Sequence, residues 1–286
     1  MKNLKYFLQF LIIISLMIFY KVIGLKFSRI VSSRLFLFFG PFFRSVETSV
    51  KNLSLAFPKS NIKFKKKIIK NMWKSYGKIF AEYIFIKNFR ENRLKKILEV
   101  KGQEILEGIK LSKEPVIFVS GHFDNFELMA MHIEMSGVNV AAIYRPLNNP
   151  FLNPIMENIR RKYICEKQVQ KGTSGTKKIL KYFKSGYSIA LMIDQRVSQG
   201  IRSPFFENDA LTTTLPAQFF KKFNCKIIPI YIERKKNEKF FLEIMRPIDF
   251  NNNQSIEEIT LNLNRSLEAM IFKNPNQWIW SHNRWK

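Results

Sequence analysis

The residues best suited to chemistry lie in the segment 115–127, PVIFVSGHFDNFE. An apolar strand runs through Gly121 into a polar turn that carries His122, and a helical run follows closely. Ligands of open α/β sheets gather at the carboxyl ends of strands. His122 and Glu127 would splay apart on one continuous helix, but a His122 in the turn and a Glu127 in the first helical turn can meet. We therefore predict that His122 acts as a base and that Glu127 orients its imidazole.

A structural interpretation of the same residues stands beside the catalytic one. Asp124 and Glu127 are three positions apart and precede an apolar helical run, the pattern of a helix capping box. The two interpretations are compatible with each other. No Ser or Cys near His122 carries a nucleophile signature, which favours a histidine that activates a substrate over one that activates a protein nucleophile.

A second polar group follows in the segments 144–150 (YRPLNNP) and 160–162 (RRK). Turn chemistry explains the Pro and Asn residues. The arginines are either solvated, or they hold a phosphate or a developing oxyanion. The spacing alone leaves both alternatives open.

Short apolar strands that alternate with helices position these residues. Strands are predicted at 116–120, 138–144, 188–194 and 226–232, which indicates an α/β fold with a central mixed sheet flanked by helices. Between them, one helix is predicted to open at Ser174 and close at Gly186, and a capping box at Ser255 and Glu258 opens the last helix.

The N-terminus carries an apolar stretch at residues 4–25 with lysines only near its two ends, long enough to span a bilayer. No small-residue cleavage site follows it, so we predict an uncleaved transmembrane anchor at 1–25 and a catalytic domain at 26–286. The positive charges at 21–34 favour a cytoplasmic catalytic domain. Residues 26–58 read as basic, Phe-rich helical segments.

The composition limits the class of partner. The chain has 48 Lys+Arg against 22 Asp+Glu, a net charge of +26 that attracts nucleic acid, anionic lipid or an acidic protein. Its 28 Phe and 46% hydrophobic residues exclude a disordered basic tail and suit work at a membrane surface. Cys165 and Cys225 have neither disulfide-framework nor zinc-site spacing.

Several of these motifs occur together in one order. The chain resembles the late acyltransferases of lipid A biosynthesis, the lauroyl and myristoyl transferases, within a superfamily that includes glycerolipid acyltransferases. The resemblance covers nearly the whole chain. It rests on the N-terminal anchor, NLSLAFP at 52–58, the His-x4-Glu element at 122–127, YRP at 144–146 with Asn149 and Arg160, Asp194-Gln195, FF at 205–206 with TLPA at 214–217, and QWIWSHNRW at 277–285.

This resemblance implies a reaction and a set of site residues. His122 would be the general base, Glu127 its partner, and Arg160 a support for the oxyanion or a phosphate. Substrate-binding roles would fall to Asn125, Tyr144, Arg145, Asn149, Asp194 and Gln195. The family resemblance implies acyl transfer from acyl carrier protein to a hydroxyl of a Kdo-lipid A precursor at the bacterial inner membrane, by direct attack, with no metal, cofactor or nucleic acid.

Two positions depart from the family pattern. Asp124 and Glu207 stand where glycine is usual. Asp124 also places a second carboxylate near His122, so the sequence leaves open whether Asp124 or Glu127 is its partner. A glycerolipid or other glycolipid acyltransferase is the alternative enzyme. A catalytically silent, membrane-tethered basic module is the alternative of another class, but it would give the polar residues at the strand ends no purpose.

Overall fold

A seven-stranded sheet forms the centre of the computed structural model, which describes residues 2–286 apart from the side chains at positions 92, 93 and 95. Met1, the first residue of the expected anchor, lies outside the described residues. The strands of the sheet are β1 (Leu98–Lys101), β2 (Ile117–Ser120), β3 (Val140–Tyr144), β4 (Lys167–Gln170), β5 (Ser188–Met192), β8 (Ile227–Arg234) and β9 (Phe240–Ile244).

The strand order is β1-β9-β8-β2-β5-β3-β4, and only the β8–β9 pair is antiparallel, which confirms the predicted mixed sheet. The four predicted strands correspond to β2, β3, β5 and β8, with ends shifted by at most two residues. Because β2, β5, β3 and β4 are parallel, their carboxyl ends lie at one edge of the sheet. Residues that follow these four strands are therefore neighbours in space.

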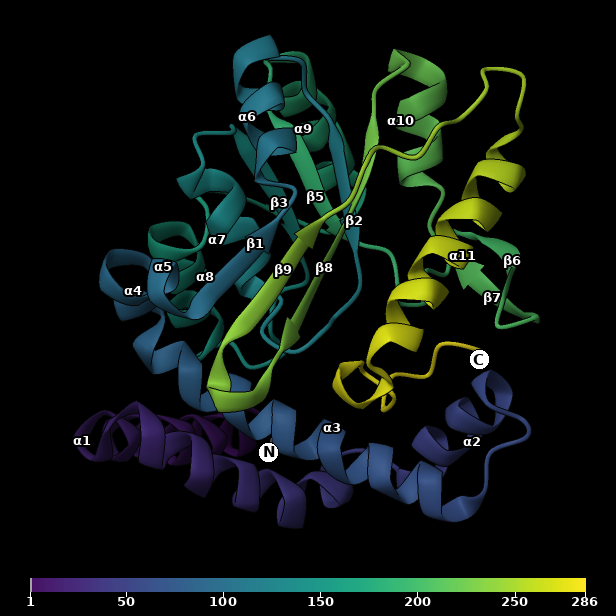
Figure 1. Cartoon of the computed structure of the whole chain (residues 1–286). Helices are drawn as coiled ribbons and strands as arrows, with labels where there is room; N and C mark the ends of the chain where they lie inside the picture. The colour runs from purple at the N-terminus through teal and green to yellow at the C-terminus, as the bar shows by residue number, and fades with distance from the viewer. Residues whose placement is uncertain (1) are drawn as a thin grey trace.

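Helices cover both sides of the sheet, and Figure 1 shows α1 to α3 running together beneath it. The predicted capping box at Ser255 and Glu258 is confirmed at the start of the last helix. The helix expected from Ser174 to Gly186 begins one residue earlier and ends at Lys184. The α-helices are α1 (Lys2–Phe43), α2 (Val46–Ala56), α3 (Ile62–Glu82), α4 (Ile86–Asn88), α5 (Leu94–Ile97), α6 (Gln103–Ser112), α7 (Glu127–Met135), α8 (Asn153–Tyr163), α9 (Thr173–Lys184), α10 (Leu215–Phe223) and α11 (Ile256–Lys273).

The first helix changes direction within its length. Gly24 has φ 75° and ψ 165°, outside the helical region, so α1 consists of two helical halves. The second half packs closely on α3: a Cβ added at Gly77 would lie 2.4 Å from the carbonyl oxygen of Ser32, so only glycine permits this approach. The first half is long and apolar enough to cross a membrane, and most of its surface is exposed.

A two-stranded hairpin, β6 (Ile201–Phe205) and β7 (Asn208–Thr212), packs against α11. Its turn residues Phe206 and Glu207 have φ values of 49° and 59°. Asp124 has φ 34°. Both positions at which the chain departs from the family's glycine thus adopt a backbone conformation that favours glycine, and Asp124 is the one that lies beside His122.

Candidate active site

His122 lies where β2 ends, and the sheet register decides which residue faces it. Ser120 of β2 pairs with Met192 of β5. Two residues further along each parallel strand, His122 meets Asp194. The backbone N–H of His122 donates to Asp194 Oδ2 at 2.7 Å, and its Nδ1 lies 2.8 Å from Asp194 Oδ1. Asp194 therefore holds both the backbone and the imidazole of His122.

Asp194 is fully buried and remains ionised. Burial raises the pKa of its carboxyl, but the His122 ring and the hydrogen bonds from His122 and Trp278 outweigh burial and lower the pKa below its ordinary value. The indole N–H of Trp278 donates to Asp194 Oδ2 at 2.9 Å. Because an ionised carboxylate only accepts hydrogen bonds, Nδ1 of His122 carries a proton and Nε2 is left as the basic atom.

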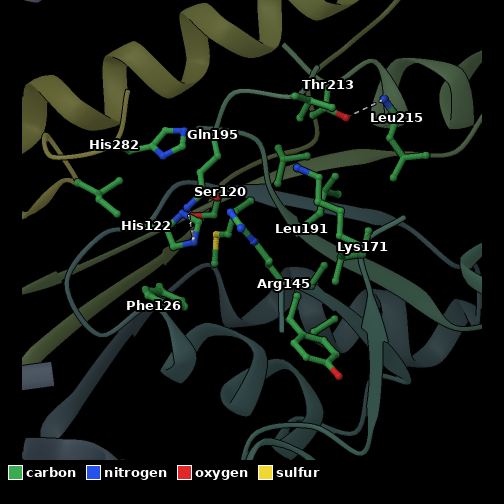
Figure 2. A pocket seen from close by; sticks show the side chains of 18 of the residues that line it. Ser120, His122, Phe126, Arg145, Lys171, Leu191, Gln195, Thr213, Leu215 and His282 are labelled. Atoms are coloured by element: carbon green, nitrogen blue, oxygen red, sulfur yellow. Dashed lines mark hydrogen bonds between the residues drawn. The ribbon is translucent and has the colours of Figure 1, made fainter. Parts of the chain in front are cut away.

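The basic Nε2 atom faces a cavity of about 1220 Å³. Gln195 Nε2 lies 3.4 Å from His122 Nε2, and the ring of Phe126 packs edge-on against the imidazole. Figure 2 shows His122 and Gln195 together at the pocket, with His282 nearby. Apolar side chains form much of the wall, among them Phe118, Met129, Ile133, Ile143, Leu191 and Ile230. The cavity combines a base with space for a hydrocarbon chain.

The expected pairing of His122 with Glu127 differs from the one in the structure. Glu127 Oε1 accepts from Arg160 Nε at 2.9 Å and Nη2 at 2.7 Å, and also from the hydroxyl of Tyr83. Glu127 opens α7 as expected, but there it faces α8, which carries Arg160. Of the described residues, Asp194 is the carboxylate that contacts His122.

Arg160 and Glu127 form a nearly buried ion pair in the cavity wall, with 13% and 8% of their side chains exposed. Burial lowers the pKa of Arg160, but Glu127 and Tyr83 outweigh it, so the guanidinium stays charged. Its Nε and Nη2 atoms are used by Glu127 and Tyr83, and within the described part of the chain Nη1 has no hydrogen-bond partner. Arg160 thus retains one donor group for a ligand.

Asp124 is not a helix cap, contrary to the expected capping box. The residue before α7 is Phe126, and no side chain caps this helix. The Asp124 carboxylate instead accepts hydrogen bonds from Arg234 Nη2 at 2.7 Å and from the hydroxyl of Ser75 at 3.0 Å. Asp124 is only 1% exposed to solvent. Arg234 lies on β8, 110 residues further along the chain. Asp124 therefore anchors the His122 turn to the sheet and to α3.

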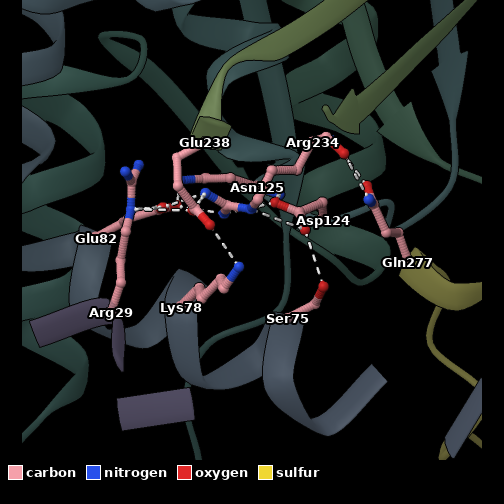
Figure 3. Close-up of polar contacts among 9 residues, drawn as sticks. All are labelled: Arg29, Ser75, Lys78, Glu82, Asp124, Asn125, Arg234, Glu238 and Gln277. Carbon is pink, nitrogen blue, oxygen red and sulfur yellow. Dashed lines mark hydrogen bonds and ion pairs between the residues drawn. The ribbon is translucent and has the colours of Figure 1, made fainter. Parts of the chain in front are cut away.

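Arg234 is the centre of a buried charge network, which Figure 3 shows. It donates to Glu82 of α3 at 2.6 and 2.9 Å as well as to Asp124. Glu82 also accepts from Arg29 of α1 at 2.6 Å and from the side-chain amide of Asn125 at 2.7 Å. The network connects the second half of α1 to the turn that carries His122.

The remaining predicted site residues divide into two groups. Tyr144, Arg145 and Gln195 line the cavity together with His122, Glu127 and Arg160. The others are not among the lining residues and have structural contacts. Asn125 bonds to Glu82, the Asn149 amide donates to the Tyr6 carbonyl at 2.8 Å, and Asp194 lies behind His122.

Ser120, the two cysteines and His282 are poorly suited to act as a nucleophile or a base. The hydroxyl of Ser120 donates to the Ile230 carbonyl at 2.6 Å. Burial raises the pKa values of Cys165 and Cys225 to about 12, so both thiols stay protonated. Burial lowers the pKa of His282 to about 4, and its neutral Nε2 accepts the backbone N–H of Arg196 at 3.1 Å. These contacts leave His122 as the group placed to act as a base.

Several functional residues were missed by the sequence analysis. Tyr83, Glu82 and Arg234 lie far from the His122 turn in sequence, and no local spacing marks them. Asp194 was assigned a substrate-binding role from the resemblance, but its contact with His122 was not predicted. It ends a predicted strand, and the carboxyl ends of parallel strands share one edge of the sheet, so its position pointed to this contact.

Comparisons with known proteins identify the family of this chain. The family described as bacterial lipid A biosynthesis acyltransferase matches residues 1–286. A lipid A biosynthesis acyltransferase of Haemophilus influenzae is 26% identical over 82% of this chain and 76% of its own length. The lipid A biosynthesis lauroyltransferase of Escherichia coli K12 is 25% identical over 82% of this chain and 77% of its own length. The lipid A biosynthesis myristoyltransferase of the same organism is 23% identical over 80% of this chain and 71% of its own length. Because the match extends over its whole length, the chain belongs to the bacterial lipid A biosynthesis acyltransferase family.

Proposed function

We propose that the protein transfers a fatty acyl chain from acyl carrier protein to a hydroxyl of a Kdo-bearing lipid A precursor. The observation that carries this proposal is the His122–Asp194 pair, which lies on a cavity with a partly apolar wall in a member of this family. A thioester is an activated donor, so the reaction needs a base, an oxyanion support and a slot for the chain.

In the proposed reaction, Nε2 of His122 accepts the proton of the acceptor hydroxyl as its oxygen attacks the thioester carbonyl. The charge of Asp194 stabilises the imidazolium that forms. The guanidinium of Arg160, oriented by Glu127, supports the oxyanion of the tetrahedral intermediate. The carbon–sulfur bond then breaks, and the imidazolium returns the proton to the leaving thiolate. One such base contributes roughly 10²- to 10⁴-fold to the rate.

The choice of donor rests on charge. The net charge of +26 suits an acidic carrier protein, and electrostatic steering of such a partner weakens with salt. The family names of the relatives support lipid A as acceptor. A glycerolipid acceptor is the alternative that an assay must separate.

Purified, detergent-solubilised protein is expected to acylate a Kdo-lipid A precursor with acyl carrier protein as donor, and mass spectrometry of the product checks this. Activity should fall several-fold between low salt and roughly 0.5 M salt, because the Debye length shrinks below 10 Å. His122→Ala protein is the matched negative control. Efficient acylation of a lysophospholipid, with none of the lipid A precursor, would establish the alternative enzyme.

We further propose that the first half of α1 spans the inner membrane and that the catalytic domain lies in the cytoplasm. Its exposed apolar surface and the flanking Lys5, Lys21 and Lys26 support this topology. In the structure the N-terminal end of this half lies against the domain, where Asn149 bonds to the Tyr6 carbonyl and Phe7 packs on Phe151. A transmembrane position of the helix therefore requires these two contacts to open.

Deleting residues 1–25 is therefore expected to shift the protein from the membrane pellet to the soluble fraction while the remaining domain stays folded. Arg29 and its bond to Glu82 are retained in the truncated chain. Membrane flotation and thermal melting measure the two effects. A C-terminal reporter that is active only in the periplasm would contradict the proposed orientation.

A further inference from the structure

Two cations lie side by side at the sheet edge, at the ends of β3 and β4. Tyr144 pairs with Gln170 in the register, and the backbone N–H of Lys171 donates to the Tyr144 carbonyl at 2.8 Å. Arg145 and Lys171 are therefore adjacent residues on neighbouring parallel strands. Both line the cavity, and Figure 2 shows both side chains at the pocket that contains His122.

Of the cations that line the cavity, Arg160 has a carboxylate partner among the described residues, whereas Arg145 and Lys171 have none, like Arg44, Lys177, Arg196 and Lys286. Arg160 pairs with Glu127, and Arg234 pairs with Glu82 and Asp124. Among the described residues, no carboxylate forms an ion pair with Arg145 or Lys171. Burial and the charge of Arg145 lower the pKa of the Lys171 ammonium below its ordinary value. Both effects penalise the charged lysine in the free protein, and an anion between the two cations would relieve them.

A helix N-terminus opens onto the same wall. Helix α9 begins after Gly172, and no side chain caps its first turn. Gly172, Thr173 and Thr176 line the cavity, so uncapped backbone N–H groups and hydroxyls lie beside Lys171. Gly172 has φ 137°, and no atom lies within 4 Å of a Cβ built there, so the approach to the turn is open. The helix dipole adds positive potential to that of the two cations.

We propose that Arg145, Lys171 and the first turn of α9 form a binding subsite for a phosphate ester of a substrate. This inference rests on the proposed function, which supplies two phosphate-bearing substrates: the acceptor with its sugar phosphate and the carrier protein with its phosphodiester arm. The subsite lies on the cavity that contains His122 and is separate from the Glu127–Arg160 pair, whose guanidinium already has a carboxylate partner. It holds the substrate through charge, and it takes no part in proton transfer.

Kinetics of Lys171→Gln, Arg145→Gln and the double variant test the subsite. Lys184→Gln is the matched control, because it removes one exposed cation from the last turn of α9, away from the cavity. Loss of each charge-assisted hydrogen bond should raise KM for the phosphate-bearing substrate about tenfold, and kcat should change little. The control should keep the wild-type KM for both substrates.

Two arms identify the source of the phosphate. If the acceptor supplies it, KM for the acceptor rises in the variants, and an enzymatically dephosphorylated acceptor raises the wild-type KM but not that of the double variant. If the donor supplies it, KM for acylated carrier protein rises instead. Unchanged KM values for both substrates in the double variant would overturn the subsite.

A binding measurement separates this proposal from the proposed reaction. The full-length wild-type protein in detergent should bind inorganic pyrophosphate in isothermal titration calorimetry, and the double variant should bind it at least about tenfold more weakly. Equal binding by both proteins overturns the subsite even if acyl transfer is observed. Absence of acyl transfer with differential pyrophosphate binding would reject the proposed reaction and keep the subsite.

Discussion

Asp194→Asn is expected to lower kcat by roughly 10³- to 10⁴-fold with little change in KM, because it reverses the protonation of His122. Asp194 Oδ2 accepts two hydrogen bonds, from the His122 backbone N–H and the Trp278 indole. The amide oxygen of Asn must occupy that position, since an NH2 group there would face two donors. The NH2 group then faces His122 Nδ1, which must lose its proton to accept, and Nε2 becomes protonated. The base is thereby blocked while the packing is retained.

Turnover of Asp194→Asn, measured with saturating substrates beside thermal melting, checks this expectation. His122→Ala should show a loss of at least about 10²-fold. Glu127→Gln is the matched control, because it makes the same carboxylate-to-amide change at the other carboxylate of the cavity wall, where it faces Arg160 rather than His122. We expect a smaller loss for Glu127→Gln. A large loss of turnover in Glu127→Gln together with wild-type turnover in Asp194→Asn would identify Glu127 as the functional partner of His122.

Arg234→Met is expected to lower the free energy of unfolding by about 3–5 kcal/mol, the usual cost of leaving buried charges without their partner. It removes the hydrogen bonds of Arg234 to both Asp124 and Glu82. The turn that carries His122 would lose its anchor on β8, so turnover should fall as well. Chemical denaturation and steady-state kinetics measure the two effects.

Asp124→Gly provides the control for this network. Glycine relieves the positive φ of 34° at that position and removes one of the carboxylates that Arg234 neutralises. The double variant Asp124→Gly/Arg234→Met should therefore be more stable than Arg234→Met alone. Equal stability of the two would contradict the expected cost of leaving the Asp124 carboxylate buried without Arg234.

The pH dependence of stability gives a second measure of the network. Burial raises the pKa of Glu82, but Arg234 and Arg29 outweigh it, so the folded-state pKa lies below the ordinary value of 4.5. Such a carboxyl contributes stability above its unfolded pKa, and the contribution is lost as pH falls through the folded-state pKa. The wild-type melting temperature should therefore fall on acidification below that ordinary value. The fall should be smaller in Arg234→Met, because Glu82 has then lost its main positive partner.

The sequence by itself determined the local part of this site. Apolar runs bounded by turn residues predicted β2, β3, β5 and β8, and the position after β2 placed His122 at the edge where ligands bind. Asp194 ends the predicted strand 188–194 and Arg145 follows the predicted strand 138–144, so the same strand pattern assigns both to that edge. Strand periodicity and the residues that end a strand are properties of neighbouring positions, so one chain without a structure is enough to detect them.

The tertiary structure decided which of these residues meet. His122 and Asp194 are 72 positions apart, and only the pairing of Ser120 with Met192 brings them together. The capping box expected for Asp124 was wrong because Arg234, 110 positions away, takes its carboxylate. Glu127 faces Arg160 for the same kind of reason. Contacts between side chains on different strands and helices depend on sheet register and helix packing, and the spacing along one segment carries no information about either.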